Sequence, residues 1–250
     1  MHSDFDPARM RRNVLREVLG SVAHGVLYPF GYLPRRHQPL RAKDIDTVVF
    51  VHGLAANRAC LFPLQLWLSR AGYGRQLSFN YSTSGSVEKM ALHLKREIDD
   101  NVRGGRIHVV AHSLGGLVTR YYVQALDGDR RVSAVVTLGT PHGGTYPSVY
   151  APSAMLQQLR PDGAFLKHLT SLPPPAHTRF TSIGARSDHL VVPSEHAFAP
   201  FGERVPLFED LGHSTLLLSP SVFRAVQAAL PLPTSPPSPL SRGTGEGEER

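Results

Sequence analysis

From residue 45 onward, short runs of β-branched and other apolar residues alternate with longer segments of helical spacing. The runs fall at 47–51, 76–79, 107–110 and 132–138, and the helical segments lie between them at 59–71, 86–102 and 114–126. Strands that are apolar along their whole length and separated by helices form a parallel sheet that is buried on both faces. The pattern therefore predicts an α/β fold, with a mostly parallel sheet and helices on both faces.

A long insertion separates the strand that ends at residue 138 from a further strand at 178–183. Its middle has helical spacing, and four apolar residues there look exposed: Met155, Leu156, Phe165 and Leu166. An insertion of this kind, about 145–177, is either a lid or substrate wall, or a packed helical excursion. A short strand near 204–206 and a closing helix near 219–230 complete the predicted domain, which spans 44–230.

The two ends of the chain differ from the domain between them. Residues 1–43 hold eight basic and three acidic residues, and they comprise a predicted helix at 8–27 and a proline-rich lead-in. Residues 231–250 are rich in Pro, Ser and Gly and are predicted to be disordered. Because the positive charge is concentrated at one end, a nucleic-acid partner is not expected. The basic helix is either a solvated arm or a peripheral contact with an anionic membrane.

Cysteine count and hydropathy limit the chemistry and the compartment. The single cysteine, Cys60, excludes an intrachain disulfide and a thiolate metal cluster, and no His/Asp/Glu spacing predicts a metal site or a cofactor. No cleavable signal and no apolar run long enough for a membrane span are evident. A monomer in the cytoplasm, with the membrane-peripheral alternative, is expected; the sequence leaves secretion open.

The segment Ala111-His112-Ser113-Leu114-Gly115-Gly116 lies between a predicted strand and a predicted helix. This is the setting of a nucleophile elbow, a sharp turn that lifts a serine out of the sheet. The helix that follows directs its positive N-terminus at the site where an oxyanion forms. Ser113 is therefore the predicted nucleophile, although Ala111 stands where the usual pattern has glycine.

A serine hydroxyl needs a base, and the base needs a carboxylate to fix its tautomer. In folds with such an elbow these partners follow in the order Ser, acid, His, each on a loop after a strand. Asp188 and His213 occupy such positions. Asp210 is the competing acid, but three residues of separation is awkward for a side chain that must approach the ring of His213 from behind.

A second motif, Phe50-Val51-His52-Gly53-Leu54, ends the first strand. A His-Gly pair there lets the next backbone N–H point at a developing oxyanion, so the backbone amides of Leu54 and Leu114 form the predicted oxyanion hole. The substrate-binding residues are predicted to be His52, Gly53, His112, Met155 and Leu156.

With these motifs the chain resembles the α/β-hydrolase superfamily, in particular its bacterial triacylglycerol lipase and esterase branch and the PGAP-like acyl-ester hydrolases. The resemblance covers about 45–230 and rests on VHGL, AHSLGG, GTPHGG, SIGARSDHLVVP and LGHSTLLLSP. It implies the α/β-hydrolase fold with a helical insertion after the sixth strand of that fold, and cofactor-free acyl-enzyme chemistry in which Ser113, Asp188 and His213 act as a triad.

The predicted function is a serine esterase or lipase that hydrolyses carboxylic esters, small or acyl-lipid. An acyl-thioesterase or amidase with the same three residues is the nearest alternative. The remaining alternative is a non-catalytic binding protein of the same fold, since one fold can serve functions other than catalysis.

Overall fold

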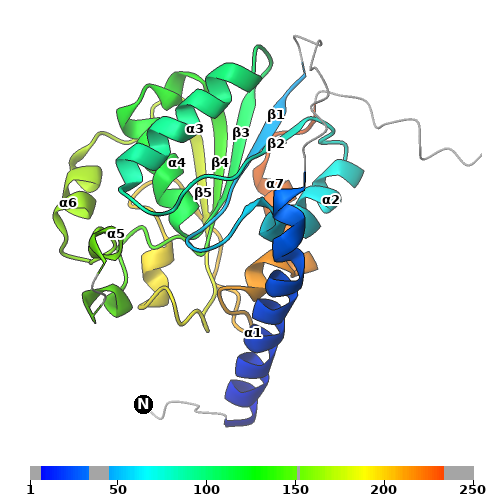
Figure 1. Ribbon diagram of the computed structural model, residues 1–250, viewed down its shortest axis with the longest axis vertical. Helices are drawn as coiled ribbons and strands as arrows, with labels where there is room; N and C mark the ends of the chain where they lie inside the picture. Colours follow the sequence, from blue (N-terminus) through cyan, green and yellow to red (C-terminus); the bar gives the residue numbers. More distant parts are fainter. Residues whose placement is uncertain (1–6, 34–44, 151–152, 234–250) are drawn as a thin grey trace, which may run out of the picture.

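The computed structural model describes residues 7–33, 45–150 and 153–233, and its centre is a sheet of parallel strands (Figure 1). The strands run in the order β2-β1-β3-β4-β5-β6. Their bounds are β1 Thr47–Val51, β2 Gln76–Ser78, β3 Ile107–His112, β4 Val132–Leu138, β5 Arg179–Ile183 and β6 Glu203–Arg204. Every neighbouring pair is parallel, so the carboxyl ends of all the strands lie at one edge of the sheet.

Helices cover both faces of this sheet, as the alternation of strands and helices predicts. The α-helices are α1 Pro7–Leu27, α2 Phe62–Arg70, α3 Val87–Asn101, α4 Leu114–Ala125, α5 Ala154–Gln157, α6 Ala164–Ser171 and α7 Pro220–Ala229. Helices α3 and α4 pack together on one face, and α2 and α7 pack together on the other. The predicted α/β class, a mostly parallel sheet with helices on both faces, is confirmed by this arrangement.

The strand residues divide between two apolar cores. Val49, Val109 and Val135 are in register across β1, β3 and β4, and all three pack under α3 and α4. Their neighbours Val48 and Val110 point to the opposite core under α2 and α7. Each fully buried side chain of this size stabilises the fold by roughly 1.5–3 kcal/mol, which is why both faces of these strands are apolar.

The insertion follows β4, the strand that ends at Leu138 as predicted, and it packs against the domain. Met155, Phe165 and Leu166 are buried in the core under α3 and α4, so the expectation that they are exposed is wrong. The guanidinium of Arg120, on α4, donates to the carbonyl of Leu169 in α6. Helical spacing shows that a segment has an apolar side, but only the tertiary packing shows what that side meets.

Helix α1 lies outside the sheet and its covering helices and projects away from them (Figure 1). It contacts the segment after His213, where Glu17 accepts hydrogen bonds from the backbone amides of Ser214 and Thr215. Within the described residues no helix combines the length and the apolar character needed to cross a membrane.

Candidate active site

Ser113 lies at the turn between β3 and α4. Its backbone has φ 54° and ψ −126°, in the positive-φ region that residues other than glycine rarely adopt. The amide of Ser113 donates to the carbonyl of Leu138 on β4 at 2.9 Å, and its own carbonyl accepts from Gly116. Strain of this kind costs on the order of 1–3 kcal/mol and concentrates at functional sites.

The two glycines after the elbow are required by close backbone packing. A Cβ atom on Gly115 would lie 2.5 Å from the carbonyl oxygen of His52, and one on Gly116 would lie 1.9 Å from the Thr140 hydroxyl. Real Cβ atoms do not approach other atoms so closely, so the first turn of α4 can meet β1 and the loop after β4 only with glycine here. The Gly-Gly pair thus fixes the start of the helix behind Ser113.

His213 and Asp188 form a buried pair at the carboxyl edge of the sheet. His213 Nδ1 lies 2.8 Å from Asp188 Oδ2, while Asp188 Oδ1 accepts from the amides of Leu190 at 2.8 Å and Val191 at 2.9 Å. An ionised carboxylate can only accept, so the imidazole proton sits on Nδ1 and Nε2 is left free as an acceptor. That is the tautomer a general base needs.

The competing acid, Asp210, does not reach the imidazole through such a bond. Its carboxylate accepts from Arg9 Nε at 2.8 Å, and that guanidinium lowers the pKa of Asp210. Asp210 is exposed and pairs with Arg9 near the start of α1, so the side chain that pairs with His213 is Asp188.

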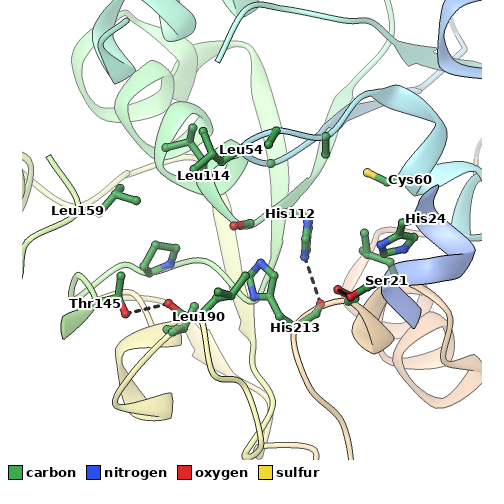
Figure 2. A pocket seen from close by; sticks show the side chains of 18 of the residues that line it. Ser21, His24, Leu54, Cys60, His112, Leu114, Thr145, Leu159, Leu190 and His213 are labelled. Carbon is green, nitrogen blue, oxygen red and sulfur yellow. Dashed lines mark hydrogen bonds between the residues drawn. The ribbon is translucent and has the colours of Figure 1, made fainter. Parts of the chain in front are cut away.

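Ser113 and His213 line one cavity of about 590 Å³. Its apolar wall includes Leu156, Leu159 and Leu190, and Figure 2 shows Leu159 and Leu190 with His213 around this space. A mostly apolar cavity with a few polar groups at one point is the usual form of a small-molecule site. The cavity therefore provides room for an apolar group next to the elbow.

Leu54 and Leu114, whose amides are the predicted oxyanion hole, also line this cavity and are labelled in Figure 2. A Cβ atom on Gly53 would lie 2.8 Å from Ser113 Cβ, so the end of β1 passes directly beside the elbow. Leu114 is the first residue of α4, where a helix leaves its amides without intrahelical partners. Both amides are thus near Ser113, although their role stays a prediction.

Of the predicted substrate-binding residues, Gly53, His112 and Leu156 line the cavity, whereas His52 and Met155 do not. The His52 ring is buried and stacks on Tyr81 with centroids 4.3 Å apart, and burial lowers its pKa. Met155 packs into the core under α3 and α4. Leu156 and Met155 are adjacent on the single turn of α5, so only one of them faces the cavity.

His112 supports His213 from the side. Its Nε2 lies 3.3 Å from the carbonyl oxygen of His213, and the two rings are 4.6 Å apart (Figure 2). Burial holds the pKa of His112 well below its ordinary value, so the ring is neutral at pH 7. A neutral ring here adds no positive charge beside His213.

Helix α1 and the turn that follows it contribute four residues to the cavity that the sequence did not identify as part of the site. These are Ser21, His24 and Gly25 on α1 and Tyr28 directly after it. Their spacing of three, four and seven residues places them on one helix face, which is the signal that could have grouped them. Figure 2 shows Ser21 and His24 at the end of the cavity next to Cys60. Cys60 is buried, which raises the pKa of its thiol to about 12 and keeps it protonated.

Several proteins are similar to this chain. A family model for palmitoyl protein thioesterase matches residues 47–171, half of the chain. Among solved structures, the mature lipase BlEst2 of Bacillus licheniformis is 16% identical with a TM-score of 0.61, over 79% of this chain and 97% of that one. A gene product of Listeria innocua is 16% identical with a TM-score of 0.58, over 74% and 94%. The esterase Pf2001 of Pyrococcus furiosus is 19% identical with a TM-score of 0.52, over 74% and 81%.

Identities this low show a shared fold, while the family match extends through the first strands and the elbow to the end of α6. Together they confirm the resemblance to the α/β-hydrolase superfamily. The chain is a carboxylic ester hydrolase of the α/β-hydrolase fold, and it belongs to the palmitoyl protein thioesterase family.

Proposed function

We propose that the chain hydrolyses acyl-lipid esters through an acyl-enzyme formed on Ser113. The observation that carries the proposal is the His213–Asp188 hydrogen bond of 2.8 Å at a cavity that the elbow serine also lines. A serine in a strained turn, a histidine with its Nδ1 proton fixed by a carboxylate and a nearby apolar wall are the parts that acyl transfer requires.

In this mechanism His213 Nε2 takes the proton of Ser113 while the serine oxygen attacks the carbonyl carbon. The backbone amides of Leu54 and Leu114 stabilise the oxyanion, which is worth on the order of 3–4 kcal/mol for each such donor. The alcohol leaves with the proton from His213, and water then releases the acid by the same steps in reverse. Asp188 stays ionised throughout and holds the imidazole in position.

The size and lining of the cavity support an acyl chain as the group that binds beside Ser113. The wall comes from α5, the segment after it and the loop that follows Asp188, and its residues there are leucine and valine: Leu156, Leu159, Leu190 and Val191. Each methylene that leaves water stabilises binding by about 0.8 kcal/mol, so catalytic efficiency is expected to rise with acyl length until the cavity is filled.

A thioester is the second candidate substrate, and the family match to palmitoyl protein thioesterase favours it. The same residues serve both reactions. A thiolate is a better leaving group than an alkoxide and needs less protonation by His213, so a site that can cleave an oxygen ester can also cleave a thioester. The two are separated by the ratio of kcat/KM for oxygen esters and thioesters that carry the same acyl group.

The test is hydrolysis of p-nitrophenyl esters and matched acyl-thioesters over a series of acyl lengths, with a p-nitroanilide to detect amidase activity. Ser113→Ala is expected to lose turnover of every substrate while it keeps its unfolding midpoint. Ser69→Ala, an exposed serine on α2, is the matched control and is expected to behave as the wild type. Turnover retained in purified Ser113→Ala would refute the mechanism, and no dependence on acyl length would refute the lipid substrate.

A further inference from the structure

Helix α1 is docked by its polar side and exposes its apolar side, the reverse of an ordinary surface helix. The contact side carries Glu17, which is 7% exposed and bonded to Ser214 and Thr215, and Gly20, whose Cβ would lie 3.0 Å from Thr215. The opposite side carries six apolar residues that are each 53–65% exposed: Val14, Leu15, Val18, Leu19, Val22 and Val26. We call these six the apolar face of α1.

The apolar face is one continuous stripe. At 3.6 residues per turn its six positions fall within roughly 140° of the helix circumference, centred opposite Gly20. Exposed aromatic residues continue it where α1 ends, with Phe30 at 57% and Tyr32 at 65% exposed in the turn Tyr28–Tyr32. A contiguous exposed apolar patch marks a surface that is covered in use.

The charges beside the apolar face favour one kind of partner. Four arginines and a single acid lie on α1, and that acid, Glu17, is buried. Arg11, Arg12 and Arg16 are exposed, and Arg11 lies within the stripe itself. A second copy of the chain packed on this face would bury Arg11 in an apolar contact, whereas an anionic lipid surface complements both the charge and the apolar side chains.

The position of the cavity agrees with a lipid surface. Of the α1 residues that line the cavity, His24 falls on the docked side, Ser21 falls between that side and the apolar face, and Gly25 falls at the edge of the apolar face. In Figure 1 the first half of α1 projects beyond the rest of the molecule, where a planar surface can reach it. A helix lying in the interface would therefore hold the cavity, which α1 helps to line, close to the lipid.

We propose that α1 is a membrane-surface helix, whose apolar face inserts into the interface of an anionic lipid bilayer while its polar side stays docked on the loop after His213. The binding of α1 to the membrane is inferred from its exposure and charge alone. Only its use, to draw an acyl substrate from the bilayer into the cavity, rests on the proposed function.

The test is sedimentation of the full chain with vesicles of phosphatidylcholine alone and of phosphatidylcholine mixed with phosphatidylglycerol. The wild type is expected to bind the mixed vesicles. The variant Val14→Gln/Val18→Gln/Val22→Gln is expected to lose at least about tenfold in partition coefficient. Arg11→Gln/Arg16→Gln is expected to lose about fivefold per arginine on the mixed vesicles only.

The matched control is Leu66→Gln/Leu92→Gln, which changes exposed apolar residues of α2 and α3 and should bind as the wild type. Turnover of a water-soluble ester should be unchanged in the triple valine variant. This result separates a failure of membrane binding from a failure of the proposed function. The proposal is overturned if the wild type does not bind the mixed vesicles, or if the triple valine variant binds them equally well. It is also overturned if light scattering shows a wild-type dimer that the same variant disrupts, because the occupant is then a second copy.

Discussion

Replacing Glu17 by alanine removes the acceptor that joins α1 to the segment after His213. In the structure one carboxylate oxygen accepts from the Ser214 amide, and the other accepts from the Thr215 amide and hydroxyl, both at 3.2 Å. The Thr215 hydroxyl keeps its contacts with Gly212, so the two backbone amides are the groups left without a partner. The variant therefore weakens the docking of α1 at one defined point.

The size of the effect follows from those two amides. Leaving a buried donor unsatisfied costs about 1–3 kcal/mol, and water can enter from the nearby cavity, so a total of about 2–4 kcal/mol is expected. If these amides exchange with solvent through undocking of α1, this loss accelerates their exchange by roughly 30- to 700-fold. Glu17→Gln keeps one carbonyl oxygen as an acceptor and should fall between alanine and the wild type.

The assay is hydrogen–deuterium exchange followed by mass spectrometry on peptides that cover 211–218. Peptides from α3, Val87–Asn101, serve as the internal reference because this helix lies on the other face of the sheet. Faster exchange confined to 211–218 and to α1 is the expected result. Unchanged exchange in Glu17→Ala would show that α1 does not hold this loop, and equal acceleration in α3 would show global destabilisation instead.

Two further predictions concern the free energy of unfolding, measured in urea. Gly116→Ala should lower it by about 1–3 kcal/mol, because the added Cβ would lie 1.9 Å from the Thr140 hydroxyl. Gly25→Ala, whose Cβ meets nothing within 4 Å, should raise it by about 0.5–1 kcal/mol, and equal effects of the two variants would refute the packing argument. Burial holds the pKa of His112 and of His142 well below the ordinary value, so both are neutral when folded and protonate on unfolding below about pH 6.5. Stability should therefore fall between about pH 6.5 and pH 5, by up to about 1.4 kcal/mol per pH unit for each ring. His142→Gln should reduce the slope of the free energy of unfolding against pH, and an unaltered slope would contradict a neutral His142 in the folded protein.

The strands could be predicted from the sequence because their environment leaves a local pattern. Strands β1, β3 and β4 are covered on both faces, so each is rich in β-branched residues and lacks a regular alternation of apolar and polar residues. The elbow is local in the same sense, since Gly115 and Gly116 follow Ser113 directly and each relieves a contact behind it. Asp188 could be identified from its place after a strand, without knowledge of the loop that holds it.

Other features of the site depend on contacts between distant segments. The phase of α5 decides whether Met155 or Leu156 faces the cavity, and that phase is set by packing under α3 and α4. Helix α1 joins the site through Asn13 and Glu17, whose partners lie 174 to 198 residues further along the chain. Local helix and strand propensities do not predict contacts between segments so far apart in the chain.

Reaction with a fluorophosphonate tests directly whether His213 and Asp188 activate Ser113. A fluorophosphonate reacts with a serine whose proton is taken by a neighbouring base, and it needs no knowledge of the natural substrate. Mass spectrometry is expected to show one adduct, mapped to Ser113, that is missing in His213→Ala and after unfolding in urea. A folded wild-type protein that gains no adduct, or that carries it on another serine, would contradict the account.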